Sequence, residues 1–426
     1  MMAHGSRGDV QPLVAIGMEI QRRGHSVVLA VPVNMARFVE ESGLKAVPLP
    51  GDTQEWGDRA ETKHLLGSGD VSGFLTGLRA FMAEHGPGIV RALIEASKGA
   101  DLIVSAFTTE DVAAVIAELR KVPLVLVHSF PTRRTGVVAN PMVTGRSSRL
   151  GPLNWRTHVA YERTAWRERA PRLNALRGQL GLPETKLPTP RRAVALGALE
   201  LQAYSPNVIG GRRPSHRHPV GWPRLGRDER TALGESGLPS DLDDWLSAGS
   251  PPVYVGFGSV PVPDPERLIA SIDAATAELG LRAVVCSGWT DLSGAGAVDP
   301  GRIRAVGAVD HEALLPRCRI AVHHGGSGTT AAAVRAGVPM LICSLLVDQL
   351  LWGERMQRLG CGVHLRYPDL TPVTLTTALH RLLDPAFATN VADLARKVNA
   401  EPAAAGVAAD LILAHGRAGA EPDTRS

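Results

Sequence analysis

The sequence predicts an α/β protein built from two doubly wound domains with parallel sheets. A chain of 426 residues is longer than one ordinary domain, and its 44% apolar and 21% charged content is typical of a globular protein. Apolar runs alternate with helical stretches along the first half, as in a parallel sheet covered by helices. In the second half, a strand, a glycine-rich turn, a helix and another strand follow one another over residues 320–346.

In the first half, the chain opens with a turn, a helix and a strand, which together form a βαβ start. The expected strands are 26–31, 45–48, 101–106, 122–129 and 199–204, and the expected helices are 13–23, 77–97, 112–121 and 163–180. Only residues 1–4 precede the first turn, so the opening strand is short. We expect an N-terminal domain over residues 1–204 and a linker rich in Pro, Gly, Arg and His over 205–226.

The second half repeats the alternation of strands and helices, and a domain is expected over residues 227–390. The expected strands are 252–257, 281–286, 303–306, 320–322, 339–346 and 363–366, and the expected helices are 266–279, 329–335 and 371–383. Residues 391–417 are expected to form a last helical segment, and residues 418–426 a frayed tail.

Composition argues against several other classes of protein. The formal net charge of +4 is small for this length and does not indicate nucleic-acid binding. The four cysteines have neither metal nor redox spacing, and reduced core cysteines are expected. His216 and His218 have no Cys or carboxylate partner nearby, so they indicate solvated residues rather than a metal site. No apolar run reaches ~18 residues and no signal peptide is visible, so stable membrane insertion is not expected and a cytoplasmic location is.

The glycine-rich turn of the second half has the pattern of an anion site. It follows a strand and opens a helix, so it directs backbone N–H groups and the positive helix end toward one point. Its glycines allow close approach to a phosphate, and His323 adds a donor. The candidate residues are His323, Gly325, Gly326, Ser327, Gly328 and Thr329. The alternative is a structural turn with two structural histidines.

A carboxylate and an amide, Asp348 and Gln349, follow the end of the next strand. Ligands bind beyond the carboxyl ends of strands in an open parallel sheet, so this pair is expected on the same edge as the glycine turn. A carboxylate accepts hydrogen bonds and an amide both donates and accepts, which suits neighbouring sugar hydroxyls. Phosphate and hydroxyl contacts on one edge indicate a nucleotide sugar.

Five short motifs occur in order over about fifty residues: HEALLP at 311–316, HHGGSGTT at 323–330, RAGVP at 335–339, DQ followed by WGER at 348–355, and LGCG at 359–362. In these motifs the chain resembles the family-one glycosyltransferases with the GT-B fold. The nearest branch is that of sterol glucosyltransferases and bacterial natural-product glycosyltransferases. The resemblance implies two Rossmann-like domains facing a central cleft, with the donor held by the C-terminal domain and the acceptor by the N-terminal one. It also implies that residues 391–417 return to the first domain.

The resemblance extends to the first turn, HGSRGD at 4–9, where it places Asp9 at the position of the catalytic base. A hydroxyl acceptor needs a base, whereas the nucleotide is already a good leaving group. The alternatives are that Asp9 caps the following helix, or that His4 is the base. Relatives often hold an acidic partner for the base on a later turn, which implies Asp111 or Glu110, although helix capping explains both equally well.

On the donor side, the resemblance implies further contacts around the turn. Ser259 would donate its hydroxyl to the diphosphate, and residues Val309 to His311 would flank the base of the nucleotide. Asp348 and Gln349 would orient the sugar. Because backbone N–H groups and His323 would stabilise the leaving diphosphate, no metal and no tightly bound cofactor are expected.

The stretch 130–168 is rich in arginine and contains two tryptophans. These residues are Arg133, Arg134, Arg146, Arg149, Trp155, Arg156 and Trp166. The favoured interpretation is a solvated basic surface with the tryptophans packed beneath it. The alternatives are a mouth for a flat apolar acceptor and a weak membrane-facing patch.

The sequence thus predicts an inverting glycosyltransferase that moves a hexose from a nucleotide sugar to a hydroxyl of a hydrophobic small molecule, such as a sterol or a polyketide. The sterol-like motifs favour UDP-glucose, with dTDP and deoxysugars left open. Two other classes remain as alternatives: a catalytically idle protein of the same fold that binds nucleotide sugars, and a nucleotide-sugar epimerase.

Overall fold

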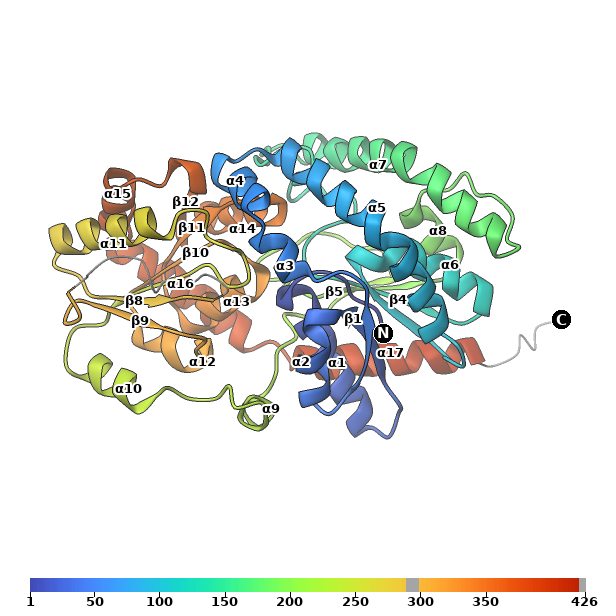
Figure 1. The fold of residues 1–426 in the computed structure, drawn as a ribbon, viewed down its shortest axis with the longest axis horizontal. Helices are drawn as coiled ribbons and strands as arrows, with labels where there is room; N and C mark the ends of the chain where they lie inside the picture. Colours follow the sequence, from blue (N-terminus) through green and yellow to red (C-terminus); the bar gives the residue numbers. More distant parts are fainter. Residues whose placement is uncertain (289–298, 421–426) are drawn as a thin grey trace. The chain divides into compact units, whose positions relative to one another are not determined.

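The computed structural model describes residues 1–288 and 299–420, so the expected tail lies outside the described residues from 421 onward. The chain forms two compact α/β units, each with its own parallel sheet (Figure 1). The first unit contains residues 1–53, 81–225 and 401–426, and the second contains residues 54–80 and 226–400. The division differs from the expected one in three places. Residues 54–80 and 391–400 group with the second unit, and most of the expected linker groups with the first.

All strand pairs in the first unit are parallel. The strands are β1 (Val28–Pro32), β2 (Lys45–Leu49), β3 (Ile103–Ala106), β4 (Leu124–His128), β5 (Leu199–Gln202) and β6 (Arg217–Pro219). Strands β1 and β2 pair with each other, and β3 to β6 pair in sequence order. Met2 lies between the two groups: its N–H donates to Val104 O at 2.9 Å, and the next N–H, of Ala3, donates to Ala30 O at 3.0 Å. The short opening segment therefore fills the position between β1 and β3.

The helices of the first unit cover this sheet. They are α1 (Arg7–Arg22), α2 (Val33–Glu41), the second part of α5 (Val71–Ala96), α6 (Glu110–Arg120), α7 (Gly151–Gln179), α8 (Thr189–Ala195) and α17 (Ala404–Ala420), with a 3₁₀ turn at Phe107–Thr109. Helix α17 packs against α1, where Arg23 pairs with Asp410 at 2.5 Å and donates to Gly406 O at 3.2 Å. The last helix thus packs on the first one.

Helix α1 begins at Arg7, six residues before the expected start at 13. Its N-cap is Ser6, and the Asp9 carboxylate accepts a hydrogen bond from the Ser6 N–H at 3.0 Å. This capping arrangement closes the first turn, and Pro12 is accommodated inside the helix. The expected start at 13 lies just after this proline, a residue that usually disrupts a helix interior.

The second unit is a six-stranded parallel sheet in the order β12-β11-β10-β7-β8-β9. Its strands are β7 (Val253–Gly256), β8 (Ala283–Cys286), β9 (Ile303–Val306), β10 (Ile320–His323), β11 (Met340–Ser344) and β12 (Gly362–Arg366). From β7 the chain builds outward to β9, then returns to the other side of β7 and builds outward to β12. The strand order therefore reverses between β7 and β10, and in open α/β sheets ligands bind beyond the carboxyl ends at such a point.

Helices on both faces complete the second unit. They are α3 (Thr53–Asp58), α4 (Ala60–Ser68), the first part of α5, α9 (Arg227–Ala232), α10 (Ser240–Ser247), α11 (Pro265–Leu279), α12 (His311–Leu314), α13 (Ser327–Ala336), α14 (Val347–Arg358), α15 (Pro372–Leu382) and α16 (Pro385–Asn399), with 3₁₀ turns at Leu315–Arg317 and Tyr367–Asp369. All four cysteines are buried and free, as expected. Within the described residues, no helix has the length and apolar character needed to cross a bilayer.

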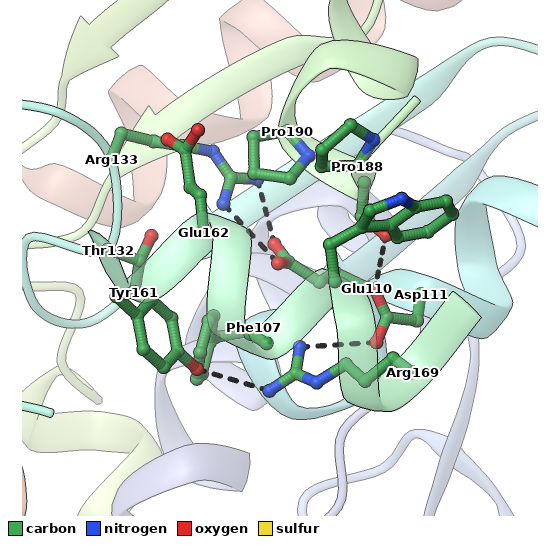
Figure 2. Close-up of a pocket in the computed structure, with 13 residues that line it drawn as sticks. Phe107, Glu110, Asp111, Thr132, Arg133, Tyr161, Glu162, Arg169, Pro188 and Pro190 are labelled. Atoms are coloured by element: carbon green, nitrogen blue, oxygen red, sulfur yellow. Dashed lines mark hydrogen bonds and ion pairs between the residues drawn. The ribbon is translucent and has the colours of Figure 1, made fainter. Parts of the chain in front are cut away.

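A buried cluster of charges ties the strands of the first unit to the loop after β4. Arg133 donates to Glu110 at 2.8 Å and to Glu200 at 2.6 Å, and Glu200 also accepts from Arg217 at 2.8 Å (Figure 2 shows the Arg133–Glu110 pair). Burial would raise the pKa of Glu110, but Arg133 and His128 lower it to about 2. Arg133 is 4% exposed, so the sequence interpretation that placed it on a solvated surface is wrong for this residue.

Replacing Arg133 by methionine is expected to lower the free energy of unfolding by about 3–5 kcal/mol, because two buried carboxylates would lose their shared cation. Arg37→Ala, which removes an exposed pair with Glu41, should leave the free energy of unfolding nearly unchanged. Urea denaturation followed by circular dichroism measures both changes. Equal small losses in the two variants would contradict the role given to the cluster.

The lowered pKa of Glu110 also predicts how this stability depends on pH. The contribution of the cluster to the free energy of unfolding should be present above about pH 4.5 and should be lost as the pH falls toward 2.

Candidate functional site

The site begins where β7 and β10 end side by side in the second unit. His323, the last residue of β10, pairs in register with Gly256, the last residue of β7. After β7 the chain turns at Gly258, which has a φ of +60°, and continues to Ser259. After β10 it turns at Gly325, which has a φ of +92°. Two turns therefore leave the sheet together at the point where the strand order reverses.

Close packing requires glycine at two positions of the second turn. A Cβ on Gly325 would lie 2.7 Å from the Ile342 side chain, and Gly325 also needs its positive φ. A Cβ on Gly326 would lie 2.4 Å from Nε2 of His324. The backbone at this turn is thus held against β11 and against a histidine ring, and no larger residue fits there without a shift.

The turn leads directly into α13, whose N-terminus has no side-chain cap. The N-cap residue is Gly326, and Ser327, Gly328 and Thr329 form the first turn of the helix. The helix begins two residues earlier than the sequence indicated. Because a glycine cap offers no side-chain acceptor, the cap itself occupies none of the N–H groups of this turn, and the positive end of the helix dipole lies here. An anion such as a phosphate is the group that such a helix end binds most readily.

Both histidines of the turn are buried, and they make different contacts. The Nδ1 of His323 accepts a hydrogen bond from the Gly325 N–H at 3.1 Å, and its Nε2 has no partner among the described residues. His324 hydrogen-bonds to the Gly256 carbonyl and lies against Gly258 and Gly326. Burial, together with nearby histidines, holds the pKa of His323 well below its usual value and lowers that of His324 to about 4. Both rings are therefore neutral at pH 7 in the ligand-free protein.

Asp348 and Gln349 lie in the first turn of α14, beyond the end of β11. The Gln349 side-chain oxygen accepts from the N–H groups of Leu345 and Leu346 at 2.8 and 3.0 Å, so its amide NH₂ is the part left to donate. Burial raises the pKa of Asp348 to about 6. A Cβ on Gly325 would lie 3.3 Å from the Gln349 Cβ, so this pair adjoins the glycine turn.

The remaining donor-side candidates lie on the same sheet edge. Ser259 is half-buried in the turn after β7, and Val309 is half-buried just before α12. The Nε2 of His311 forms a 2.7 Å hydrogen bond with the hydroxyl of Tyr254, a buried residue of β7. The sequence offered no signal for Tyr254, because its contact joins strand β7 to helix α12, and the two residues are 57 positions apart in the sequence. The hydrogen bond from β7 therefore fixes the position of the His311 side chain.

The candidates for the base, Asp9 and His4, lie in the first unit. The Asp9 carboxylate is half-buried and takes part in the cap of α1, so the capping alternative describes one of its contacts. His4 is buried at the end of the opening segment, and its Nε2 has no partner among the described residues. Burial, followed by the charge of His85, lowers the pKa of His4 to about 4. Each residue is thus held in place by its surroundings before any ligand binds.

Asp111 occupies the wall of a small cavity in the first unit (Figure 2). Its carboxylate accepts from Arg169 at 3.2 Å and from the Thr189 hydroxyl, and Arg169 also donates to the Tyr161 hydroxyl at 3.1 Å. These contacts connect α6, α7 and α8. The cavity measures about 30 Å³, which is room for a water molecule rather than for a sugar acceptor. Asp111 therefore has a structural role, because its carboxylate joins three helices.

No group of three or more His, Cys, Asp or Glu side chains within residues 1–288 and 299–420 is arranged to hold a metal ion. The groups that could hold a ligand are the α13 N-terminus, the two histidines, and the Asp348–Gln349 pair. Chemically they offer backbone and amide donors, one carboxylate acceptor and neutral imidazoles. This combination suits a diphosphate joined to a polyhydroxylated group.

The two halves of the chain match two described families. Residues 1–135 match the glycosyltransferase family 28 N-terminal domain, and residues 274–413 match the erythromycin biosynthesis protein CIII-like C-terminal domain. Two solved structures share the fold. The glycosyltransferase of kitacinnamycin has a TM-score of 0.70 at 19% identity, covering 97% of this chain and 98% of its own. The glycosyltransferase VinC in complex with dTDP has a TM-score of 0.67 at 21% identity, covering 98% and 99%.

Three curated relatives cover most of this chain. An uncharacterized glycosyltransferase of Mycobacterium tuberculosis is 36% identical over 422 residues, which are 96% of this chain and 97% of the relative. The O-mycaminosyltylonolide 6-deoxyallosyltransferase of Streptomyces fradiae is 32% identical over 422 residues, 96% and 93% of the two chains. The sterol 3-beta-glucosyltransferase of Pichia angusta is 28% identical over 390 residues, 89% of this chain and 30% of the relative. The chain therefore belongs to the family-one glycosyltransferases of the GT-B fold, in the branch of natural-product glycosyltransferases and sterol glucosyltransferases.

Proposed function

We propose that this glycosyltransferase moves a hexose from a nucleoside diphosphate sugar to a hydroxyl of a hydrophobic small molecule, with inversion at the anomeric carbon. The observation that carries the proposal is the glycine-capped N-terminus of α13, which lies at the strand-order reversal next to Asp348 and Gln349. One end of such a site suits a diphosphate and the other suits sugar hydroxyls.

In this proposal the diphosphate binds the N–H groups of Gly326 to Thr329, and the Ser259 hydroxyl donates to it from the neighbouring turn. His324 lies against Gly258 and Gly326, so we assign the direct imidazole contact to His324. His323 acts through the turn, because its Nδ1 already accepts from the Gly325 N–H. Val309 and His311 flank the base of the nucleotide.

The proposed reaction combines proton transfer from the acceptor with departure of the diphosphate. Asp9 accepts the proton of the acceptor hydroxyl while that oxygen forms a bond to the anomeric carbon, and the bond from this carbon to the diphosphate oxygen breaks. The diphosphate leaves with the bonding electrons, and the α13 N–H groups stabilise its charge. His4 is the alternative base, and Asp111, or Glu110 in its place, would act as an acidic partner of the base. No metal and no tightly bound cofactor enter this scheme.

The proposal also concerns the identity of the donor sugar and of the acceptor alcohol. UDP-glucose is the donor that the sterol-like motifs favour, and the name of the Streptomyces relative supports a deoxysugar donor as the competing choice. The test is incubation with UDP-glucose, dTDP-glucose and a dTDP-deoxysugar, each with sterol, polyketide and flavonoid alcohols. Mass spectrometry should detect one glycosylated product. Release of a nucleoside diphosphate without an acceptor would favour the epimerase alternative, and donor binding without turnover would favour the idle binding protein.

Replacing Asp9 by asparagine is expected to lower kcat at least about a hundredfold with little change in donor affinity, because the amide cannot take the proton. Asparagine keeps an oxygen that can accept from the Ser6 N–H, so the cap of α1 is retained. Steady-state kinetics and calorimetry measure the two effects, with Asp101→Asn at an exposed position as the control. An unchanged rate would remove Asp9 from the base role, and a larger loss in His4→Gln would assign it to His4.

Replacing His323 or His324 by alanine is expected to weaken binding of the nucleoside diphosphate by about 1.5–3 kcal/mol, measured by calorimetry. His323→Asn is the discriminating variant. An asparagine oxygen can accept from the N–H two residues on, so this variant should retain the bond to Gly325 and most of the affinity. Affinity as low as that of His323→Ala would show instead that the imidazole of His323 contacts the diphosphate itself.

The raised pKa of Asp348 predicts pH-dependent binding of the intact donor. The carboxylate is ionised above about pH 6 and becomes protonated below it, so donor affinity should fall as the pH drops from 7 to 5. Calorimetric titration across this range measures the effect. Asp348→Asn should bind the donor more weakly at pH 7 and show little further change at pH 5. An equally steep fall in this variant would assign the titration to another group.

A further inference from the structure

Exposed apolar side chains are concentrated in one short segment of the first unit. Among the described residues, five of the eight large hydrophobic side chains that are exposed lie between positions 142 and 155: Met142, Val143, Leu150, Leu153 and Trp155. Leu150 is 64% exposed and Trp155 is 44% exposed, so the expectation that the tryptophans pack beneath this surface is wrong for Trp155. The other three, Val33, Val194 and Val373, lie far from this segment in the sequence.

The same segment is basic and contains no acidic residue. No Asp or Glu occurs between Glu118 and Glu162. Arg146, Arg149 and Arg156 are all exposed and alternate with the apolar side chains. We call residues 142–156 the apolar–basic surface. It combines local positive charge with exposed hydrophobic groups, although the net charge of the whole chain is only +4.

Buried polar side chains hold this surface in a fixed shape from below. Asn154 accepts from the Ser148 N–H at 2.7 Å and donates to the carbonyls of Gly136 and Ser148 at 2.9 Å. His158 lies 3.1 Å from the Val138 carbonyl and 3.3 Å from the Asn140 amide. Several buried polar groups are thus used to fold the loop onto the first two turns of α7. The exposed apolar side chains are therefore presented by an ordered loop rather than by a frayed one.

Trp155 is positioned at the centre of this arrangement. The guanidinium of Arg134 lies 5.3 Å from the centre of its ring, and Arg134 is itself paired with Glu162. The Arg134 guanidinium, whose charge is balanced by Glu162, therefore covers one face of the indole. The side chain of Trp155 still remains 44% exposed. Tryptophan with neighbouring arginines is the combination that favours the boundary between water and hydrocarbon.

We propose that the apolar–basic surface docks reversibly on an anionic lipid bilayer. Phosphate head groups complement three exposed arginines in a stretch whose sequence contains no acidic residue. The acyl boundary takes up separate apolar side chains without the shape matching that a protein partner needs. Docking of this kind is peripheral and requires no membrane-spanning helix. The proposal goes beyond the glycosyl transfer proposed above and does not depend on it, because lipid binding is measured without donor or acceptor.

The test is flotation of the full chain with vesicles of phosphatidylcholine alone or mixed with phosphatidylglycerol. We expect binding to the mixed vesicles, weaker binding to phosphatidylcholine, and a decrease with added salt. Arg146→Gln with Arg149→Gln should lower the partition coefficient roughly 25-fold, since each cation near the surface contributes about fivefold. Leu150→Ser with Leu153→Ser should lower it at least about tenfold, because the apolar contribution is lost.

Val194→Ser with Val373→Ser is the matched control, because it removes the same kind of exposed side chain elsewhere and should leave binding unchanged. Thermal unfolding of every variant verifies that the fold is retained. Absence of binding to the mixed vesicles would overturn the proposal, and so would binding that survives Leu150→Ser with Leu153→Ser. A concentration-dependent dimer in light scattering that this double variant abolishes would also overturn it, in favour of a protein interface.

Discussion

The proposed donor site depends on the close approach of two backbone segments to the His324 ring. Gly258 and Gly326 lie on either side of it, and any side chain at Gly326 would meet its Nε2. This packing fixes the direction in which the chain leaves β10, and hence the direction of α13. A helix whose N-terminus is capped by glycine keeps its N–H groups for a ligand, whereas a serine or aspartate cap would occupy one or more of them. The steric constraint and the anion site are therefore one feature.

The groups proposed to contact the diphosphate are backbone dipoles and neutral rings rather than cations. Burial lowers the pKa of both histidines, which are neutral in the ligand-free protein, and burial raises the pKa of Asp348. Backbone N–H groups that are already oriented need no rearrangement as charge develops on a leaving diphosphate. The sequence indicated a histidine that could carry charge. Burial lowers the pKa of His323 in the ligand-free protein, and its contact with the diphosphate stays a prediction.

Most of the strands and helices could be predicted from the sequence. Apolar runs such as those of β3, β4 and β10 predicted strands because buried parallel strands are nearly continuous in apolar residues. Contacts between distant segments were not predictable. Strand β6 lies in a Pro- and Gly-rich stretch and exists only because it pairs with β5. Arg133 resembled its solvated neighbours in sequence, and its burial follows from Glu110 and Glu200 meeting across the sheet. The candidate site was predictable where motifs were local, and the difference between His323 and His324 required coordinates.

The hydrogen bonds that cap α14 limit which sugar hydroxyls Asp348 and Gln349 could bind. The Gln349 oxygen is occupied by the N–H groups of Leu345 and Leu346, so toward a ligand this side chain can only donate. Ionised Asp348 can only accept. In the proposed complex, one sugar hydroxyl must therefore accept from the amide and a neighbouring one must donate to the carboxylate. A deoxysugar that lacks either hydroxyl would leave a buried polar group without a partner, which discriminates far more strongly than a missing methylene in an apolar pocket. In the proposed complex, the first turn of α14, where these two residues lie, would therefore decide between glucose and a deoxysugar.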